Sequence, residues 1–127
     1  MQYLIETKKT FEAACVDLAA AVTRNGFGVL QKHDLGTSLR SKGVAFAEQC
    51  AIFEVCNPVH AGEVLAKNML MNMALPCRIS VFTEAGITKI GMFLPTALLG
   101  AMSPDPELMA VAVAVEEKTR RMIDEAG

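Results

Sequence analysis

The spacing of apolar residues alternates along the chain between a period of two and a period near 3.6, which distinguishes strands from helices. Runs rich in β-forming residues predict five strands, at residues 2–8, 27–31, 45–56, 77–83 and 87–93. Apolar residues three and four positions apart predict helices that begin at Phe11, Pro58 and Pro104. The polar, glycine-flanked stretch 34–43 predicts a loop with one helical turn at 37–40.

Local signals support the ends of these helices. Thr10 is a suitable N-cap for the first helix, and Gly26 follows its last turn because glycine adopts the left-handed conformation easily. Asn57 is a strong N-cap for the second helix, and Pro58 suits the first helical position, where no backbone N–H is needed. Pro76 must end that helix, since proline cannot continue the hydrogen-bond pattern.

The element order predicts an α+β fold, in which an antiparallel sheet carries helices on one face. The order is β-α-β(4)-α, with an extra helix between strands three and four. Alternation in the third predicted strand favours one apolar face for helix packing, formed by Ala47, Ala51, Phe53 and Val55. The opposite face carries Phe46 and Ile52 among glutamates and is open to water or to a partner.

Composition narrows the class of protein. The 127 residues are 52% hydrophobic and 20% charged, which is typical of a folded chain and predicts a single domain over residues 1–127. The formal net charge of −2 argues against nucleic-acid binding. The N-terminus lacks the pattern of a signal peptide, and no apolar stretch is long enough to span a membrane. We therefore expect a cytoplasmic protein without membrane contact.

Two of the four cysteines flank the second helix. Cys56 directly precedes the N-cap Asn57, where the positive end of the helix favours a thiolate. Cys77 begins the fourth strand, so antiparallel pairing of strands three and four would bring both cysteines to one end of the sheet. One hypothesis is a redox or sulfur-handling pair, with Cys56 as nucleophile and Cys77 as resolving thiol. The alternative is that both thiols are buried and inert.

A different hypothesis is a binding module for haem or another flat apolar ligand. His60 lies in the first helical turn after Asn57, where the helix end favours a neutral imidazole that could ligate haem iron or serve Cys56 as a base. Met69 and Met73 would line the site, since methionine surfaces adapt to apolar ligands. The plainer alternatives are a solvent-exposed histidine and methionines that fill the core. His60 is the only metal ligand predicted, and only if haem binds.

Three local strings add a family resemblance: Gly26-Phe27-Gly28-Val29-Leu30, Cys56-Asn57-Pro58, and Leu75-Pro76-Cys77 leading into Arg78-Ile79-Ser80-Val81-Phe82. Together they resemble the bacterial and archaeal family called domain of unknown function 302, or TT1751-like. The resemblance implies a fold like that of the TATA-binding protein and a homodimer. It also implies a link to sulfur metabolism and makes haem a candidate cofactor. It implies no settled activity, and fold alone does not transfer DNA binding.

No sequence motif decides whether the chain is an enzyme. The pair Cys56 and Cys77 favours thiol chemistry, whereas Asn57, His60, Met69 and Met73 favour a small-molecule site. A dimeric scaffold without chemistry is the third reading. The apolar residues on the open sheet face predict that a homodimer forms through that face.

Overall fold

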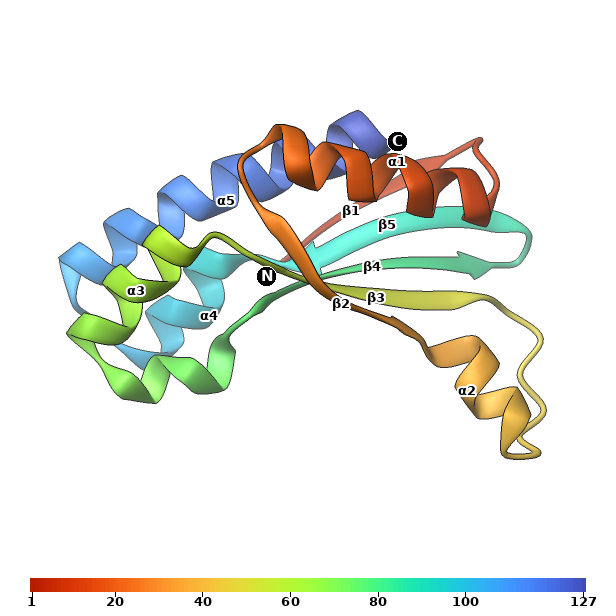
Figure 1. The fold of residues 1–127 in the computed structure, drawn as a ribbon, viewed down its shortest axis with the longest axis horizontal. Coiled ribbons are helices and arrows are strands. Elements are labelled where there is room, and N and C mark those ends of the chain that lie inside the picture. The colour runs from red at the N-terminus through yellow and green to blue at the C-terminus, as the bar shows by residue number, and fades with distance from the viewer.

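The computed structural model describes residues 1–127 and confirms an α+β fold with one antiparallel sheet. The strand order is β1-β5-β4-β3-β2, and every neighbouring pair is antiparallel (Figure 1). The strands are β1 (Gln2–Thr7), β2 (Gly28–Asp34), β3 (Cys50–Cys56), β4 (Cys77–Glu84) and β5 (Ile87–Phe93).

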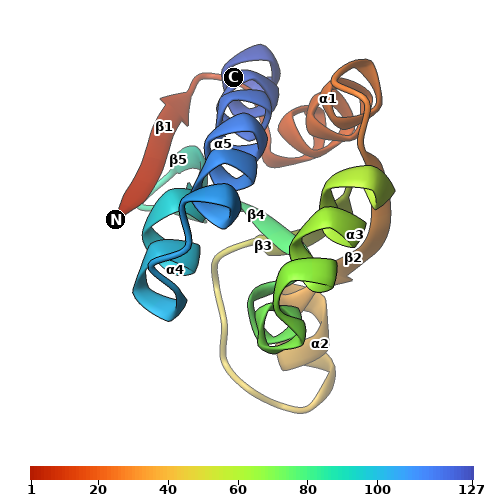
Figure 2. The ribbon, with the colours of Figure 1, turned by 90° about the vertical axis from the view of Figure 1, so that its left-hand side faces the viewer.

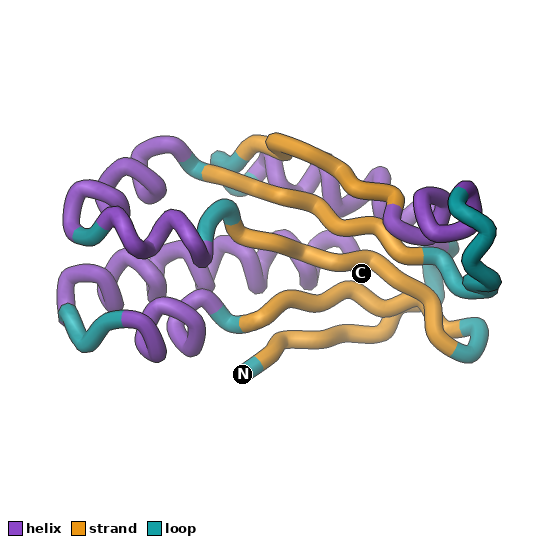
Figure 3. The backbone as a smooth tube through the Cα atoms, turned by 90° about the horizontal axis from the view of Figure 1, so that it is seen from below, coloured by secondary structure: helices purple, strands orange, loops and turns teal.

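The helices occupy three positions around this sheet. The two long helices, α1 (Phe11–Arg24) and α5 (Pro106–Ala126), cover one face, and Figure 3 shows the other face bare. Beyond one end of the sheet lie α3 (Pro58–Lys67), the 3-10 helix η1 (Met69–Ala74) and α4 (Pro95–Met102), with α3 and α4 on either side of the strand ends (Figure 2). The short helix α2 (Leu35–Ser41) projects from the opposite end.

The main core lies between the sheet and the two long helices. Ala51, Phe53 and Val55 are buried on the helix-covered face of β3, as the alternation of that strand predicts. They pack with alternate residues of β4 and β5 and with the inner faces of α1 and α5. A second, smaller core lies beyond the sheet and consists of Val64, Met71, Leu99, Leu108 and Ala112.

The predicted capping residues act as expected. Thr10 Oγ1 accepts a hydrogen bond from the Ala13 N–H at 3.1 Å. Asn57 Oδ1 accepts from the N–H groups of Val59 and His60 at 3.0 and 3.2 Å. These bonds satisfy first-turn donors that have no partner within the helix, so both helices begin where the sequence indicates.

The start of the third strand was predicted wrongly. The strand begins at Cys50, not at residue 45, and residues 44–49 form a loop. Arg40 of α2 explains this, because its Nη1 donates to the carbonyls of Phe46 and Glu48 at 3.0 and 2.9 Å. These two carbonyls therefore accept their hydrogen bonds from α2 and not from a neighbouring strand. Phe46 belongs to the loop and does not lie on the open face of the sheet.

Strand β2 also differs from the prediction. It continues to Asp34 instead of ending at residue 31, and a bulge interrupts its pairing with β3 between Val29 and Gln31. The helical turn expected at 37–40 is a full short helix, whose N-cap Asp34 accepts from the Thr37 N–H at 2.9 Å. The polar composition of this segment concealed both features.

The helices at the end of the sheet differ most from the sequence prediction. Helix α5 begins at Pro106, not at Pro104, because Asp105 supplies the N-cap. Helix α4 was not predicted, since its first flanking residue, Leu94, has no capping group. The cap comes instead from Glu116 of α5, whose Oε1 accepts from Thr96 N–H at 3.1 Å and from Thr96 Oγ1–H at 2.7 Å.

We predict that Glu116→Ala lowers the free energy of unfolding by about 1–2 kcal/mol, because it removes the only side-chain cap of α4. Glu117 lies beside it on α5 but is exposed and forms no hydrogen bond or ion pair, so Glu117→Ala serves as the matched control. Urea unfolding of both variants provides the measurement. Equal midpoints for the two variants would contradict the capping role.

Candidate functional site

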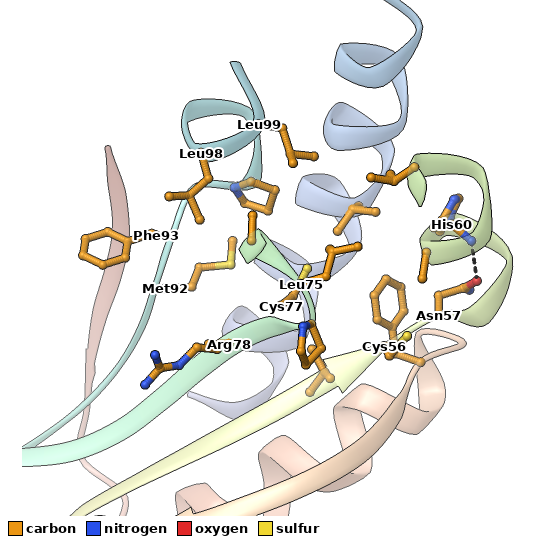
Figure 4. A pocket seen from close by; sticks show the side chains of 18 of the residues that line it. Cys56, Asn57, His60, Leu75, Cys77, Arg78, Met92, Phe93, Leu98 and Leu99 are labelled. Carbon is orange, nitrogen blue, oxygen red and sulfur yellow. Dashed lines mark hydrogen bonds between the residues drawn. The ribbon is translucent and has the colours of Figure 1, made fainter. Parts of the chain in front are cut away.

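A cavity of about 630 Å³ opens at the end of the sheet where β3 ends and β4 begins. Helices α3, α4 and α5, together with η1, form its walls, and the cavity continues onto the bare face of the sheet (Figure 4). Of its 27 lining residues, 18 are hydrophobic. This volume and lining are typical of sites for small organic molecules.

The apolar lining comes from elements far apart in the sequence. Leu65 of α3 and Leu75, which follows η1, line the cavity. Leu98 and Leu99 of α4 line it as well, and Figure 4 shows them with Leu75 around the same space. Val111 and Val115 of α5, with residues of the sheet, complete the lining. Leu98 and Leu99 were missed from the sequence because α4 itself was missed.

The polar lining carries a single formal charge. The polar side chains are those of Gln2, Asn57, His60, Asn72, Arg78 and Ser80, and no carboxylate lines the cavity. Arg78 lies opposite Glu54 in the register of β3 and β4, but the Glu54 carboxylate contacts His33 Nε2 at 2.6 Å instead. The Arg78 guanidinium therefore remains free to meet an anion at the cavity.

Cys56 and Cys77 both line the cavity, but their side chains diverge. Val55 lies opposite Cys77 in the register, so Cys56 is one residue further along and points to the other face of the sheet. All four cysteines are free thiols. Burial, and next the nearby Cys56, raise the pKa of Cys77 to about 11. Cys77 is therefore protonated at neutral pH and is a poor nucleophile.

Asn57 and Phe27 fix the position of the α3 N-terminus. Besides capping the helix, Asn57 donates from Nδ2 to the Gly26 carbonyl at 3.2 Å, which joins α3 to the turn after α1. Phe27 is buried, and its ring centroid lies 6.4 Å from that of His60. These contacts hold His60 at one wall of the cavity.

The imidazole of His60 is largely buried, with 20% of the side chain exposed. Its Nε2 lies 3.4 Å from Lys118 Nζ of α5. A lysine ammonium only donates hydrogen bonds, so Nε2 is the acceptor in this contact. The other ring nitrogen, Nδ1, is buried and has no hydrogen-bond partner. Glu63 Oε2, at 3.9 Å from Nδ1, is too distant to accept a hydrogen bond.

This arrangement does not suit His60 as an axial haem ligand. Iron requires an accessible imidazole nitrogen, whereas Nδ1 is buried and Nε2 faces Lys118 Nζ at 3.4 Å. No group of three or more histidine, cysteine or acidic side chains is placed to hold a metal ion. None of the helices combines the length and apolar character that crossing a membrane requires.

Met69 and Met73 lie outside the cavity and are 65% and 71% exposed. The sequence predicted that both would line the site, from a helix that continued to Pro76. Instead α3 ends at Lys67, and the 3-10 geometry of η1 redirects the side chains. Met71 is the buried methionine of this segment, and Met92 of β5 is the one that lines the cavity. Methionine content alone could not identify which residues reach the site.

Comparison with known proteins gives a family and a close structural relative. The family model described as domain of unknown function DUF302 matches residues 3–126. The crystal structure of an uncharacterised conserved DUF302 protein from Bacillus stearothermophilus is 35% identical in sequence, with a TM-score of 0.94 over 99% of this chain and 98% of that chain. No curated protein matches the sequence. The chain therefore belongs to the DUF302 family.

Proposed function

We propose that this protein binds a small organic anion with an apolar body in the cavity at the end of the sheet. The observation that supports this proposal is a large apolar cavity whose single formal charge is Arg78. The apolar walls would take the hydrophobic body of the ligand, and the guanidinium would hold its carboxylate or another planar anionic group.

The charge distribution favours an anion over a cation. The chain as a whole has a net charge of −2, so Arg78 is not part of a generally basic surface. No acidic side chain lines the cavity to attract a cation. The exposed guanidinium of Arg78 has no partner in the chain, so it can form charge-assisted hydrogen bonds with an anion at the mouth of the cavity.

Thiol chemistry by Cys56 and Cys77 has less support. The two side chains lie on opposite faces of the sheet, and two such cysteines cannot form a disulfide without backbone movement. The raised pKa of Cys77 also weakens its role as a resolving thiol. Cys56 remains a lining residue that a reactive ligand could reach.

We also propose a homodimer through the bare face of the sheet. Leu4 and Phe93 are 44% and 60% exposed on this face, and Ile52 lies on the same face. Exposed apolar residues gathered on one sheet face usually mark an interface. The face also carries Arg78, so a second copy would lie over the mouth of the cavity.

We predict that Arg78→Met weakens binding of the fluorescent apolar anion 1-anilinonaphthalene-8-sulfonate by about 10- to 100-fold, which is the usual effect of losing a charged hydrogen bond. N-phenyl-1-naphthylamine has the same rings without the sulfonate, and its binding should not change. Fluorescence titration provides both affinities.

The matched control is Arg121→Met, which changes the net charge equally at an exposed position outside the cavity. It should leave both affinities unchanged. Equal losses in the two arginine variants would contradict a site at Arg78, and so would failure of both probes to bind.

We predict that iodoacetamide alkylates Cys56 before the other three cysteines of the folded protein. Burial raises the pKa of Cys15, Cys50 and Cys77, and the thiolate is the nucleophile. The rise for Cys77, from 9.0 to about 11, reduces its thiolate fraction at neutral pH about a hundredfold. Peptide mass mapping over a time course near pH 7.5 gives the order. Faster labelling of Cys77 would restore the thiol hypothesis.

We predict that light scattering at micromolar concentration gives about twice the chain mass of 13.6 kDa. Phe93→Glu places a charge on the bare sheet face and should yield the monomer, because a desolvated charge opposes association. Val16→Glu is the control, since Val16 is 68% exposed on α1, on the other side of the molecule. A wild-type mass near 13.6 kDa would contradict the dimer.

A further inference from the structure

We propose that the ligand is a linear alkyl carboxylate, whose head Arg78 and Ser80 hold on the bare face of the sheet and whose chain lies among the helices at the end of the sheet. This inference rests on the proposed function and makes it more specific. It names the class of ligand, the direction in which the ligand lies and a second residue that contacts the anion.

The first support is the extent of the cavity. Its lining includes Leu4 on β1 and Leu30 on β2, which are the two edge strands of the five-stranded sheet. Four strand spacings of roughly 4.8 Å separate these edges, about 19 Å in all. The lining also continues off the sheet to Leu65 of α3 and Val111 of α5. A cavity that is this long for its volume suits a flexible chain better than a compact ring system.

The second support is that the polar side chains without a partner all lie on the sheet. Arg78 and Ser80 are two residues apart on β4, so both point to the bare face, and Gln2 lies on the edge strand β1. All three line the cavity, and none forms a side-chain hydrogen bond or an ion pair within the chain. Their donors are therefore available to a ligand.

The third support is that the polar side chains on the α3 and η1 side are engaged within the chain. Asn57 uses Oδ1 for two backbone N–H groups and Nδ2 for the carbonyl of the turn after α1. Asn72 Nδ2 donates to a carbonyl of η1 at 2.5 Å, and Nε2 of His60 faces a lysine of α5. The half-buried side chains of Leu65 and Leu75 are the accessible apolar surface here.

These two sets of residues determine the direction of the ligand. A carboxylate placed beside Leu65 would lose its water without gaining a charged partner, which is costly. Arg78 is exposed, and Figure 4 shows it and His60 on opposite sides of the drawn lining. The carboxylate therefore lies at β4, where the guanidinium meets its charge and the Ser80 hydroxyl donates a hydrogen bond to one of its oxygens. The alkyl chain runs from there toward Leu65.

The direction of the chain can be tested through the preferred chain length. Titration calorimetry with saturated fatty acids of about eight to sixteen carbons, each below its micelle concentration, gives the length that binds best. Leu65→Phe adds volume where the chain should end, so the preferred length should fall by about two carbons. Val59→Phe is the matched control, because Val59 is 68% exposed on α3 and lies outside the cavity. An unchanged preference in Leu65→Phe would overturn the proposed direction.

The role of Ser80 can be tested with the fatty acid of preferred length. Ser80→Ala should weaken its binding about three- to tenfold, which is the usual effect of losing one hydrogen bond. In Arg78→Met combined with Ser80→Ala, the loss should be smaller than the product of the two single losses, because both side chains contact one carboxylate. Ser38→Ala, on α2 and outside the cavity, should bind as the wild type does. Unchanged binding in Ser80→Ala, or losses that multiply fully, would overturn the shared contact.

The sulfonate probe 1-anilinonaphthalene-8-sulfonate distinguishes failure of this inference from failure of the proposed function. If this probe binds through Arg78 but no fatty acid binds, the class of ligand is wrong and the proposed function stands. If neither the probe nor any fatty acid binds, both proposals fail.

Discussion

The architecture depends on one mismatch of length, because α5 is longer than the sheet on which it packs. Its 21 residues span about 32 Å, whereas the longest strand, with 8 residues, spans about 27 Å at most. The N-terminal part of α5 therefore extends beyond the strand ends. Leu108 and Ala112 on that part would be exposed without a second set of partners, and α3, η1 and α4 supply them.

The same helix provides the polar contacts that hold the cavity walls. Glu116 caps α4 through Thr96, and Glu107 forms an ion pair with Lys67 at the end of α3. Lys118, on the same helix, contacts Nε2 of His60. Both walls of the cavity are thus attached to the same helix. Where α3, η1 and α4 meet at the second core they also pack on each other through Val64, Met71 and Leu99.

The sequence predicts the part of this fold that local chemistry determines. Thr10, Asn57 and Pro58 mark helix starts with their own side chains, and the alternation through Phe53 identifies the buried sheet face. Helix α4 could not be found in this way, because its capping group is Glu116, twenty residues away in sequence. The cavity was incompletely predicted for the same reason. The sequence identified Cys56, Asn57, His60 and Cys77 as residues of the site. It did not identify the wall formed by α4 or the place of Arg78 in the lining, because both depend on how elements far apart in the sequence pack together.

The bulge in β2 has a consequence for how copies of this protein can meet. Strands β1 and β2 are the two edges of the sheet, and an edge with free N–H and C=O groups can template the addition of a foreign strand. The irregularity between Val29 and Gln31 disrupts the spacing of such groups, and the charged Lys32 and Asp34 follow it. Strand addition at β2 is thereby discouraged, which protects a chain that is 52% hydrophobic from edge-to-edge aggregation.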